Sequence, residues 1–501
     1  MSLVTIDGRA VTKQLRLACD VLVVGSGPAG ATVAAALAAR GVDVLVLEEG
    51  PEAEPSQVEA SGLRAMASLY RDMGTSIAFG IAPMPYLQGR AVGGTSVVNG
   101  AICWNFPREV WDEWVRRDPA IADALPFEAL AAAEAALETR LHVAPTSAAV
   151  AGAKNLAMAR GADALGLAHR PIRRNVDGCV GSGRCLQGCP HGAKLSMDRT
   201  LLPDAVRDGA RIVSGAKVTR VLLDARGAYG AAGTTLGGAP FEARARHAVV
   251  LAASAVGTPA LLLASGLADA VVGRHLMGHP GVSVTGRFDE PIANYRGATQ
   301  GHEITGLRHE GLKPEVLGFD LGLVASRVPG SGRELATRIA ELDRYAVFGA
   351  GIRAKAEGRV TRGAFGARVS YSLTDDDVRI ARRSVRRLGE VLLAAGAREV
   401  YPGVPGFDPV VVDPARMAAI EIEAPLDPRA YAMSMTHLFG TARMGSSAES
   451  SVVRGDFRHH RTPGLFVVDS SVFPSSLGVN PQLPIMAVAR LAADRVIERA
   501  G

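Results

Sequence analysis

The chain has 501 residues, of which 48% are hydrophobic and 21% are charged. This composition is that of an ordinary globular protein and excludes an intrinsically disordered chain, and the length predicts two or more packed units. The formal net charge of +5 is small for this length and the basic residues are spread along the chain, so we expect no nucleic-acid partner.

Residues 1–20 contain no apolar run of signal-peptide length, no twin arginine and no small-residue cleavage site. Export is therefore not encoded in an obvious way. From this segment we expect a cytoplasmic protein.

The first predicted strand, residues 20–24, runs directly into the motif G-x-G-x-x-G and an alanine-rich helix. Glycine permits a tight turn and a close backbone approach there, and the N-terminus of the helix attracts a pyrophosphate. A second strand, residues 44–47, ends in Glu48, whose carboxylate can accept hydrogen bonds from the ribose hydroxyls of an adenosine. The pattern predicts a site for NAD or FAD. The glycines of the motif are Gly25, Gly27 and Gly30.

A second glycine-rich loop, residues 89–100, has the sequence GRAVGGTSVVNG. Its small residues allow backbone amides and hydroxyls to come close to a large planar or anionic ligand. A nicotinamide domain does not need such a loop at this distance from the first one. The loop therefore favours FAD over NAD.

The chain has five cysteines, which do not make a disulfide framework in a protein of this size. Three of them, Cys179, Cys185 and Cys189, have the spacing C-x5-C-x3-C-P, and its last part is similar to the end of a ferredoxin ligand run. Neither Cys19 nor Cys103 is near enough in sequence to supply a fourth thiolate. Reduced, packed thiols, an iron–sulfur cluster and a zinc site all stay open.

The longest apolar stretch, residues 248–273, contains only one charged residue, Asp269. Its length is that of a membrane-spanning helix. However, it also holds Gly257, Pro259 and Gly266, which favour a strand, a turn and a short helix. We therefore expect no transmembrane segment.

The densest basic cluster consists of four arginines within six residues. Apolar residues at three- and four-residue steps around them predict a helix with one buried face, which leaves the arginines on the solvated face. Thr374 and Asp377 predict a capping box at its start. We expect no binding role for this cluster, whose members are Arg382, Arg383, Arg386 and Arg387.

Near the C-terminus, His437 precedes Gly440-Thr441, and Asn480 lies in the segment 478–485. An imidazole titrates near neutrality and can accept a hydroxyl proton, whereas an amide can hydrogen-bond the substrate oxygen. Residues 481–495 read as a helix whose positive end would face the flavin N1 and C2 carbonyl region. The usual structural role is expected for the other histidines considered, which are His275, His279, His459 and His460.

The loop 89–100 and the segments 254–266 and 437–445 resemble the glucose-methanol-choline (GMC) oxidoreductase family in its three diagnostic regions. The segments 272–280 and 468–474 are also similar to family blocks, so the resemblance covers nearly the whole chain.

The resemblance implies an α/β FAD-binding Rossmann-like domain with an inserted α+β substrate domain built on an antiparallel sheet. We expect the FAD-binding domain to comprise residues 15–110, 196–275 and 430–501. We expect the substrate-binding domain to comprise residues 111–195 and 276–429, including the cysteine-containing segment 179–190.

The resemblance also implies FAD contacts. The adenosine half would be held by Gly25, Gly27, Gly30 and Glu48, with the backbone of Val218 at the adenine. The pyrophosphate and flavin would be lined by Gly93, Gly94, Thr95, Ser96 and Asn99, and the C-terminal flavin segment contains Asp469, Asn480 and Pro481. Some relatives attach FAD through a histidine in the second loop, but residues 97–99 here are Val-Val-Asn, which predicts a dissociable cofactor.

The implied reaction is oxidation of a small-molecule alcohol to an aldehyde or ketone. His437 would take the hydroxyl proton, the carbon would give a hydride to flavin N5, and Asn480 would hold the oxygen. The electron acceptor would be oxygen, a quinone or a redox protein.

Three alternatives stay open. One branch of the family oxidises sugars and holds a three-iron cluster, for which Cys179, Cys185 and Cys189 would be the ligands. Hydroxynitrile lyases resembling the family keep the flavin without redox use. A nicotinamide-linked flavin reductase should have a second dinucleotide motif, and none follows residue 50.

The block 473–481 is closer to long-chain alcohol and sterol oxidising relatives than to glucose oxidase and favours a bulky or apolar alcohol. The cysteine spacing points partly to sugars.

Overall fold

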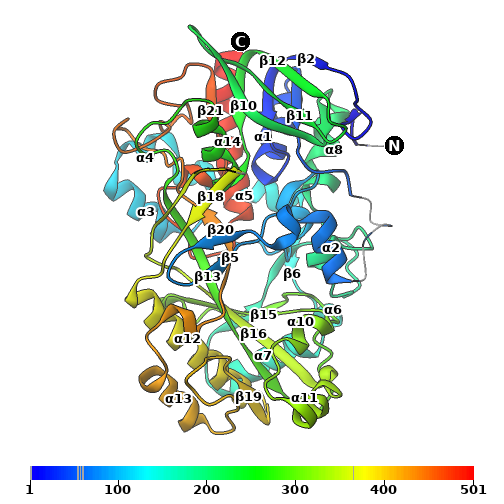
Figure 1. The fold of residues 1–501 in the computed structure, drawn as a ribbon, viewed down its shortest axis with the longest axis vertical. Coiled ribbons are helices and arrows are strands. Elements are labelled where there is room, and N and C mark those ends of the chain that lie inside the picture. The colour runs from blue at the N-terminus through cyan, green and yellow to red at the C-terminus, as the bar shows by residue number, and fades with distance from the viewer. Residues whose placement is uncertain (1–2, 54–55, 57, 59–60, 365, 501) are drawn as a thin grey trace.

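The computed structural model describes residues 3–53, 56, 58, 61–364 and 366–500. Two large sheets lie toward opposite ends of the long axis of the molecule, with both chain termini at the end of the first sheet (Figure 1). The first sheet has a parallel portion and an antiparallel meander that share one strand. In spatial order its strands are β1 (Ile6–Asp7), β9 (Arg211–Ser214), β3 (Val44–Leu47), β2 (Leu15–Val24), β12 (Pro240–Leu251), β11 (Gly227–Thr235) and β10 (Ala216–Asp224), with β21 (Leu465–Val467) also pairing with β12.

The parallel strands of the first sheet are continuous apolar runs because helices bury them. All four residues of β3 are buried, as are the last four of β2. The helix α1 (Pro28–Ala38) follows β2 and packs against α8 (Leu201–Arg207) and α14 (Gln482–Ala500). This strand–loop–helix order places the glycine motif at the carboxyl edge of the sheet, which is where doubly wound folds bind ligands.

The second sheet is mainly antiparallel and is organised around one long strand, β13 (Arg274–Arg287). β13 pairs with four other strands and so joins segments that are far apart in the sequence. In spatial order the sheet contains β5 (Met84–Pro85), β4 (Ile77–Phe79), β18 (Gly366–Ser370), β17 (Gly358–Gly363), β13, β16 (Tyr345–Ile352), β15 (Leu312–Leu317), β14 (His302–Ile304) and β7 (His169–Pro171), with β19 (Glu399–Tyr401) and β20 (Ser434–Phe439) also pairing with β13.

The two sheets match the predicted architecture of an α/β unit with an inserted antiparallel unit. The pieces 15–110 and 430–501, which we expected in the FAD-binding domain, also contribute β4, β5 and β20 to the second sheet. The division of the chain by residue ranges therefore stays a prediction.

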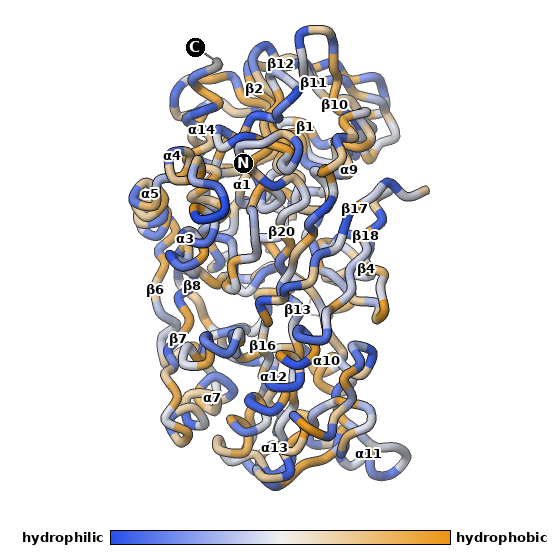
Figure 2. Tube along the Cα trace, turned by 90° about the vertical axis from the view of Figure 1, so that its left-hand side faces the viewer, coloured by the Kyte–Doolittle hydropathy of each residue, from blue (hydrophilic) through white to orange (hydrophobic). Residues whose placement is uncertain are grey.

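The apolar stretch 248–273 has the structure predicted for it. The strand β12 ends at Leu251 and the helix α9 (Ser254–Ala264) follows after two residues. Figure 2 shows hydrophobic and hydrophilic residues following one another closely along the helices of the lower lobe, such as α12 (Asp375–Ala394) and α13 (Pro414–Glu423). Among the described helices, none combines the length and the hydropathy needed to cross a membrane.

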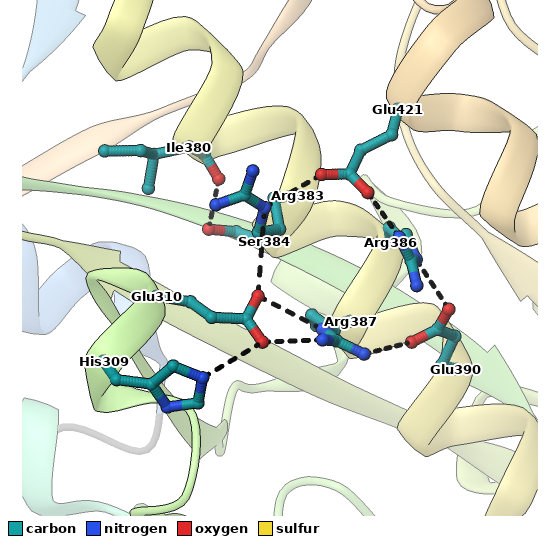
Figure 3. A network of polar contacts seen from close by, with 9 residues as sticks. All are labelled: His309, Glu310, Ile380, Arg383, Ser384, Arg386, Arg387, Glu390 and Glu421. Carbon is teal, nitrogen blue, oxygen red and sulfur yellow. Dashed lines mark hydrogen bonds and ion pairs between the residues drawn. The ribbon is translucent and has the colours of Figure 1, made fainter.

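The helix α12 begins with the predicted capping box between Thr374 and Asp377. Three of the four clustered arginines form ion pairs with carboxylates of their own and neighbouring segments (Figure 3). This network accounts for the basic cluster without a binding partner. The pairs are Arg383 with Glu421 at 2.9 Å, Arg386 with Glu390 at 2.7 Å and Arg387 with Glu310 at 2.6 Å.

The prediction for Arg382 was wrong. Its side chain is buried at 8% exposure and does not lie on the solvated face with the other three. The position lies next to the apolar residue Ala381 at the border of the buried stripe. A helical pattern locates the buried stripe but does not fix where its border runs.

We predict that Asp377→Ala lowers the free energy of unfolding by roughly 2–4 kcal/mol. The buried carboxylate accepts hydrogen bonds from the backbone N–H groups of Lys355, Ala356 and Thr374, at 2.7, 3.1 and 3.0 Å, and the substitution leaves these donors unpaired. Denaturant unfolding measures the change. The control Asp376→Ala removes an exposed carboxylate from the same turn and should cost less than about 1 kcal/mol. Equal losses of unfolding free energy in the two variants would contradict the stabilising role given to the hydrogen bonds of Asp377.

Candidate active site

A cavity of about 970 Å³ is lined by residues from both sheets. The loops after β2 and β3 and the start of α9 line it from the first sheet, and β13, β15, β16 and β20 line it from the second. Its size and its position at the carboxyl edge of a parallel sheet are those of a cofactor and substrate site.

The first glycine loop forms one end of the cavity. Gly27 is the N-cap of α1 and lines the cavity together with Gly25. Gly25 has a φ of +102°, a conformation that favours glycine. Gly30 lies behind the lining, where an added Cβ would be only 1.9 Å from the carbonyl oxygen of Gly25. Gly25 and Gly30 therefore each have a steric reason to be glycine, whereas a Cβ on Gly27 would meet only the Cα of Gly94, at 3.9 Å.

Glu48 lines the same end of the cavity and is 7% exposed. Its carboxylate accepts hydrogen bonds from the N–H and hydroxyl of Ser26, at 3.0 and 2.7 Å, and from the N–H of Gly50, at 2.8 Å. Burial raises the pKa of Glu48 above its ordinary value, and the Ser26 hydrogen bonds oppose this. The hydroxyl of Ser26 also accepts the N–H of Gly93 at 2.9 Å, so this serine, which the sequence analysis missed, joins the two glycine loops.

The second glycine loop lies directly against the first. Gly93 and Gly94 have positive φ values of +97° and +58°, and a Cβ on Gly94 would be 2.7 Å from the Cα of Gly27. Gly93 does not itself line the cavity, but its N–H donates a hydrogen bond to the hydroxyl of Ser26. Of the predicted contacts in this loop, those that line the cavity are Gly94, Thr95, Ser96 and Asn99.

The remaining predicted contacts also line the cavity. Val218 does so from β10. Asp469 is 5% exposed and accepts hydrogen bonds from the N–H groups of Ser254 and Ser471, at 2.9 and 2.8 Å, and from the hydroxyl of Thr258, at 2.6 Å. These bonds fix the start of α9 beside the C-terminal segment.

His437 is on β20 and contacts a second histidine, His279 on β13. The two Nδ1 atoms are 3.1 Å apart, and the N–H of Gly478 donates to Nε2 of His279 at 2.8 Å. Neutral His279 therefore carries its proton on Nδ1 and donates it to His437, which leaves the proton of neutral His437 on Nε2. This Nε2 has no hydrogen-bond partner among the residues that the structure describes.

Both imidazoles are held in the neutral form. Burial, together with the ammonium group of Lys313, lowers the pKa of His437 to about 3. Burial and the neighbouring His437 lower the pKa of His279 well below its ordinary value. A neutral imidazole at neutral pH is the form that can act as a base.

Asn480 lines the same cavity as His437, two residues after Gly478. Its buried Oδ1 has no hydrogen-bond partner among the residues with a described position. The predicted helix begins one residue later than expected, at Gln482, with Pro481 as the residue before it and Pro484 in its first turn. Pro481 lines the cavity, so the N-terminus of α14 is directed at this site.

Among the histidines given a structural interpretation, His275, His459 and His460 are absent from the lining of the cavity. His275 pairs with Glu357 at 2.7 Å, as expected for a structural role. His279 is the exception, because it orients His437. Its place in the block 272–280 was the available signal, but only the pairing of β13 with β20 brings the two rings together.

Two of the three clustered cysteines contact a cation. The guanidinium group of Arg174 donates to the sulfurs of Cys185 and Cys179, at 3.4 and 4.0 Å. Burial raises the pKa of the Cys185 thiol, but the cations Arg174 and Lys194 outweigh it and lower the pKa below its ordinary value. The two cations therefore favour the thiolate form of Cys185 more than its burial disfavours it.

This arrangement gives no support to an iron–sulfur or zinc site. In the described part of the chain, no three histidine, cysteine or acidic side chains are grouped so that they could hold a metal ion, and the cysteines are free. Lys194 instead ties the segment to the second glycine loop, because its ammonium group donates to the carbonyl oxygens of Val97 and Asn99 at 2.6 and 3.0 Å.

Comparison with known proteins identifies relatives over nearly the whole chain. Two family models described as GMC oxidoreductase match residues 20–281 and 354–489. An uncharacterised GMC-type oxidoreductase of Mycobacterium tuberculosis is 34% identical over 98% of this chain and 77% of its own length. A long-chain-alcohol oxidase of Arabidopsis thaliana is 30% identical over 96% of this chain and 68% of its own length.

Solved structures share the fold. Pyridoxine 4-oxidase from Mesorbium loti superimposes with a TM-score of 0.71 at 18% identity, covering 95% of this chain and 98% of its own. A variant of formate oxidase from Aspergillus oryzae superimposes with a TM-score of 0.70 at 16% identity, covering 96% and 98%. The predicted fold class is confirmed.

We predict that Gly27→Ala retains the fold but weakens dinucleotide binding by at least about tenfold, because close backbone approach at this position requires glycine. A Cβ here would meet only the Cα of Gly94, at 3.9 Å, and would project at the cavity. Flavin retained on purification, together with the melting temperature of the protein stripped of flavin, measures the two effects. Gly30→Ala, whose Cβ would collide with Gly25, should instead lower the melting temperature itself. Full flavin content in Gly27→Ala would refute the assignment of Gly27 to the dinucleotide site.

Proposed function

The chain belongs to the GMC oxidoreductase family and is an oxidoreductase, and on this premise we propose that it uses bound FAD to oxidise an alcohol to an aldehyde or ketone. The observation that carries the proposal is the convergence of His437, His279 and Asn480 on one cavity with two glycine-rich loops. The alcohol oxidases among its relatives support the same reaction class.

The residues of the cavity fit FAD. The first glycine loop and Glu48 are suited to its adenosine half, and the contact between Gly27 and Gly94 leaves backbone without side chains for the pyrophosphate. Polar atoms without protein partners, Oδ1 of Asn480 and Nε2 of Gln482, are what a site for the polar edge of the flavin would contain. When bound, FAD supplies the hydride acceptor at its N5.

We propose that His437 takes the proton of the alcohol on Nε2. The pKa of about 3 keeps this ring neutral at physiological pH, and the hydrogen bond to His279 fixes its orientation. Asn480 cannot act as a base, so we assign it a hydrogen bond to the alcohol oxygen.

Proton uptake on Nε2 requires the second tautomer of His437, with its proton on Nδ1 and donated to His279. His279 must then carry its own proton on Nε2. The N–H of Gly478 opposes this arrangement, because it donates to the same Nε2. We propose that the N–H of Gly478 leaves His279 when substrate binds. Gly478 has a φ of +71° and lies in the segment that carries Asn480 into the cavity, so the position is suited to such a movement.

The N-terminus of α14 contributes an electrostatic effect. A helix N-terminus carries partial positive charge, and negative charge accumulates at flavin N1 and the C2 carbonyl on reduction. The positions of Asn480 and Pro481 in the cavity support our proposal that α14 stabilises the reduced flavin.

A lyase that keeps its flavin without using it for oxidation is the second candidate from the sequence. Anaerobic mixing with alcohols distinguishes the two, because only an oxidase or dehydrogenase bleaches the flavin absorbance. Among the acceptors, the alcohol oxidases in the family support oxygen over a quinone or a redox protein.

We predict that His437→Ala binds FAD normally but reduces it at least about 100-fold more slowly with alcohol, the usual effect of removing a general base. Anaerobic stopped-flow absorbance measures the rate. The matched control is His460→Ala, because His460 bonds to Ser451 and does not line the cavity. A near-normal rate in His437→Ala means that the base is another residue.

We predict that the rate of flavin reduction changes less than about twofold between about pH 5 and about pH 8. The folded-state pKa of His437 lies far below that of a free histidine, so the ring stays unprotonated and active as the pH falls through about 6.5. Single-turnover reduction across this range is the measurement. A rate that halves near pH 6.5 would show that burial and the Lys313 cation do not lower the pKa of His437.

A further inference from the structure

We propose that the substrate alcohol carries a carboxylate, which Arg327 binds at the end of the cavity away from His437. The inference rests on the proposed alcohol oxidation and adds the class of substrate. It is drawn from the side chains that the second sheet directs into the cavity.

The substrate side of the cavity is a face of β15, β16 and β13 with glycine at its centre. In the register of the sheet, Glu315, Gly349 and Ser283 are directly opposite one another across the three strands. The adjacent row on the same face has Gly351 and Gly281 at the corresponding positions of β16 and β13. A Cβ on Gly351 would meet nothing within 4 Å, so the missing side chain at this position leaves room for a substrate.

The charges in the wall beside these glycines are already balanced. The ammonium group of Lys313 pairs with Glu303 at 3.1 Å and with Glu315 at 2.5 Å. Glu303 also pairs with Arg170 at 2.8 Å. Two cations and two carboxylates therefore neutralise one another, and this group has no net charge to offer a substrate.

Arg327 is different, because it has no carboxylate partner among the described residues. It lines the cavity, its guanidinium group donates to the hydroxyl of Ser283, and it lies over the ring of Phe319 with 5.2 Å to the centroid. Its Nε is buried without a partner. A half-buried guanidinium with unused donors favours an anion, and its planar fork matches a carboxylate.

The distance between two residues of β13 sets the expected length of the substrate. His279, which contacts His437, and Ser283, which contacts Arg327, are four residues apart and on the same face of the strand. Their separation is about 13 Å at the usual rise, so an alcohol carbon at His437 and a carboxylate at Arg327 are joined by a chain of roughly eight to ten carbons. Apolar side chains of Leu317 and Leu438 line the cavity as well and suit methylene groups. The substrate is a medium-chain ω-hydroxy acid.

The test compares ω-hydroxydecanoate with decanol as substrates of the FAD-loaded enzyme. The wild type should prefer the hydroxy acid by about 10- to 100-fold in kcat/KM, the range for a hydrogen bond between charged groups. Arg327→Met should remove this preference, so that the ratio of the two kcat/KM values falls to about 1. Arg327→Lys keeps the positive charge and should retain part of the preference, which guards against a misfolded variant.

Arg333→Met is the control, because Arg333 is an exposed arginine on the neighbouring helix α11 (Gly332–Ile339) and is absent from the cavity lining. It should behave as the wild type does. If decanol, or another alcohol without a carboxylate, is oxidised as well as the hydroxy acid or better, the inference is overturned while the proposed function stands. If no alcohol reduces the flavin, the proposed function itself fails.

Discussion

The ring of His279 connects the parts of the molecule on which its chemistry depends. One nitrogen contacts His437 on β20 and the other accepts the N–H of Gly478, two residues before Asn480. These segments are separated by 158 and 199 residues from His279 in the sequence, and β13 brings them together by pairing with β20. Before substrate binds, His437 and the segment that carries Asn480 are therefore both held by one buried side chain, and burial keeps that side chain neutral.

Most of the buried charges near the site are compensated by neighbouring groups, because an unpaired buried ion is costly. Glu48 is surrounded by donors from Ser26 and Gly50, Lys313 lies between two carboxylates, and Arg174 faces a thiol whose pKa it helps to lower. Arg327 lacks such a partner. The same reasoning thus explains structural ion pairs in one place and indicates a ligand in another.

Local patterns made much of the site predictable. The glycine loop after β2, Glu48 at the end of β3 and the capping box of α12 each depend on residues close together in the sequence, and each was predicted correctly in its position. His437 and Asn480 were found through their family blocks. Ser26, His279 and Arg327 were missed because their partners are distant in sequence, and the side on which Arg382 lies depends on how α12 packs. The cysteine spacing left thiols, a cluster and zinc open, and it could not show that an arginine outside the motif, Arg174, contacts two of the three sulfurs.

The central claim is that a flavin ring lies in the cavity beside His437 and Asn480. A crystal structure of the FAD complex tests it most directly. The account predicts the pyrophosphate between the two glycine loops and the reactive edge of the isoalloxazine within contact of both side chains. Density for the ring elsewhere, or at a distance from His437 too great for one alcohol to touch both, would contradict it.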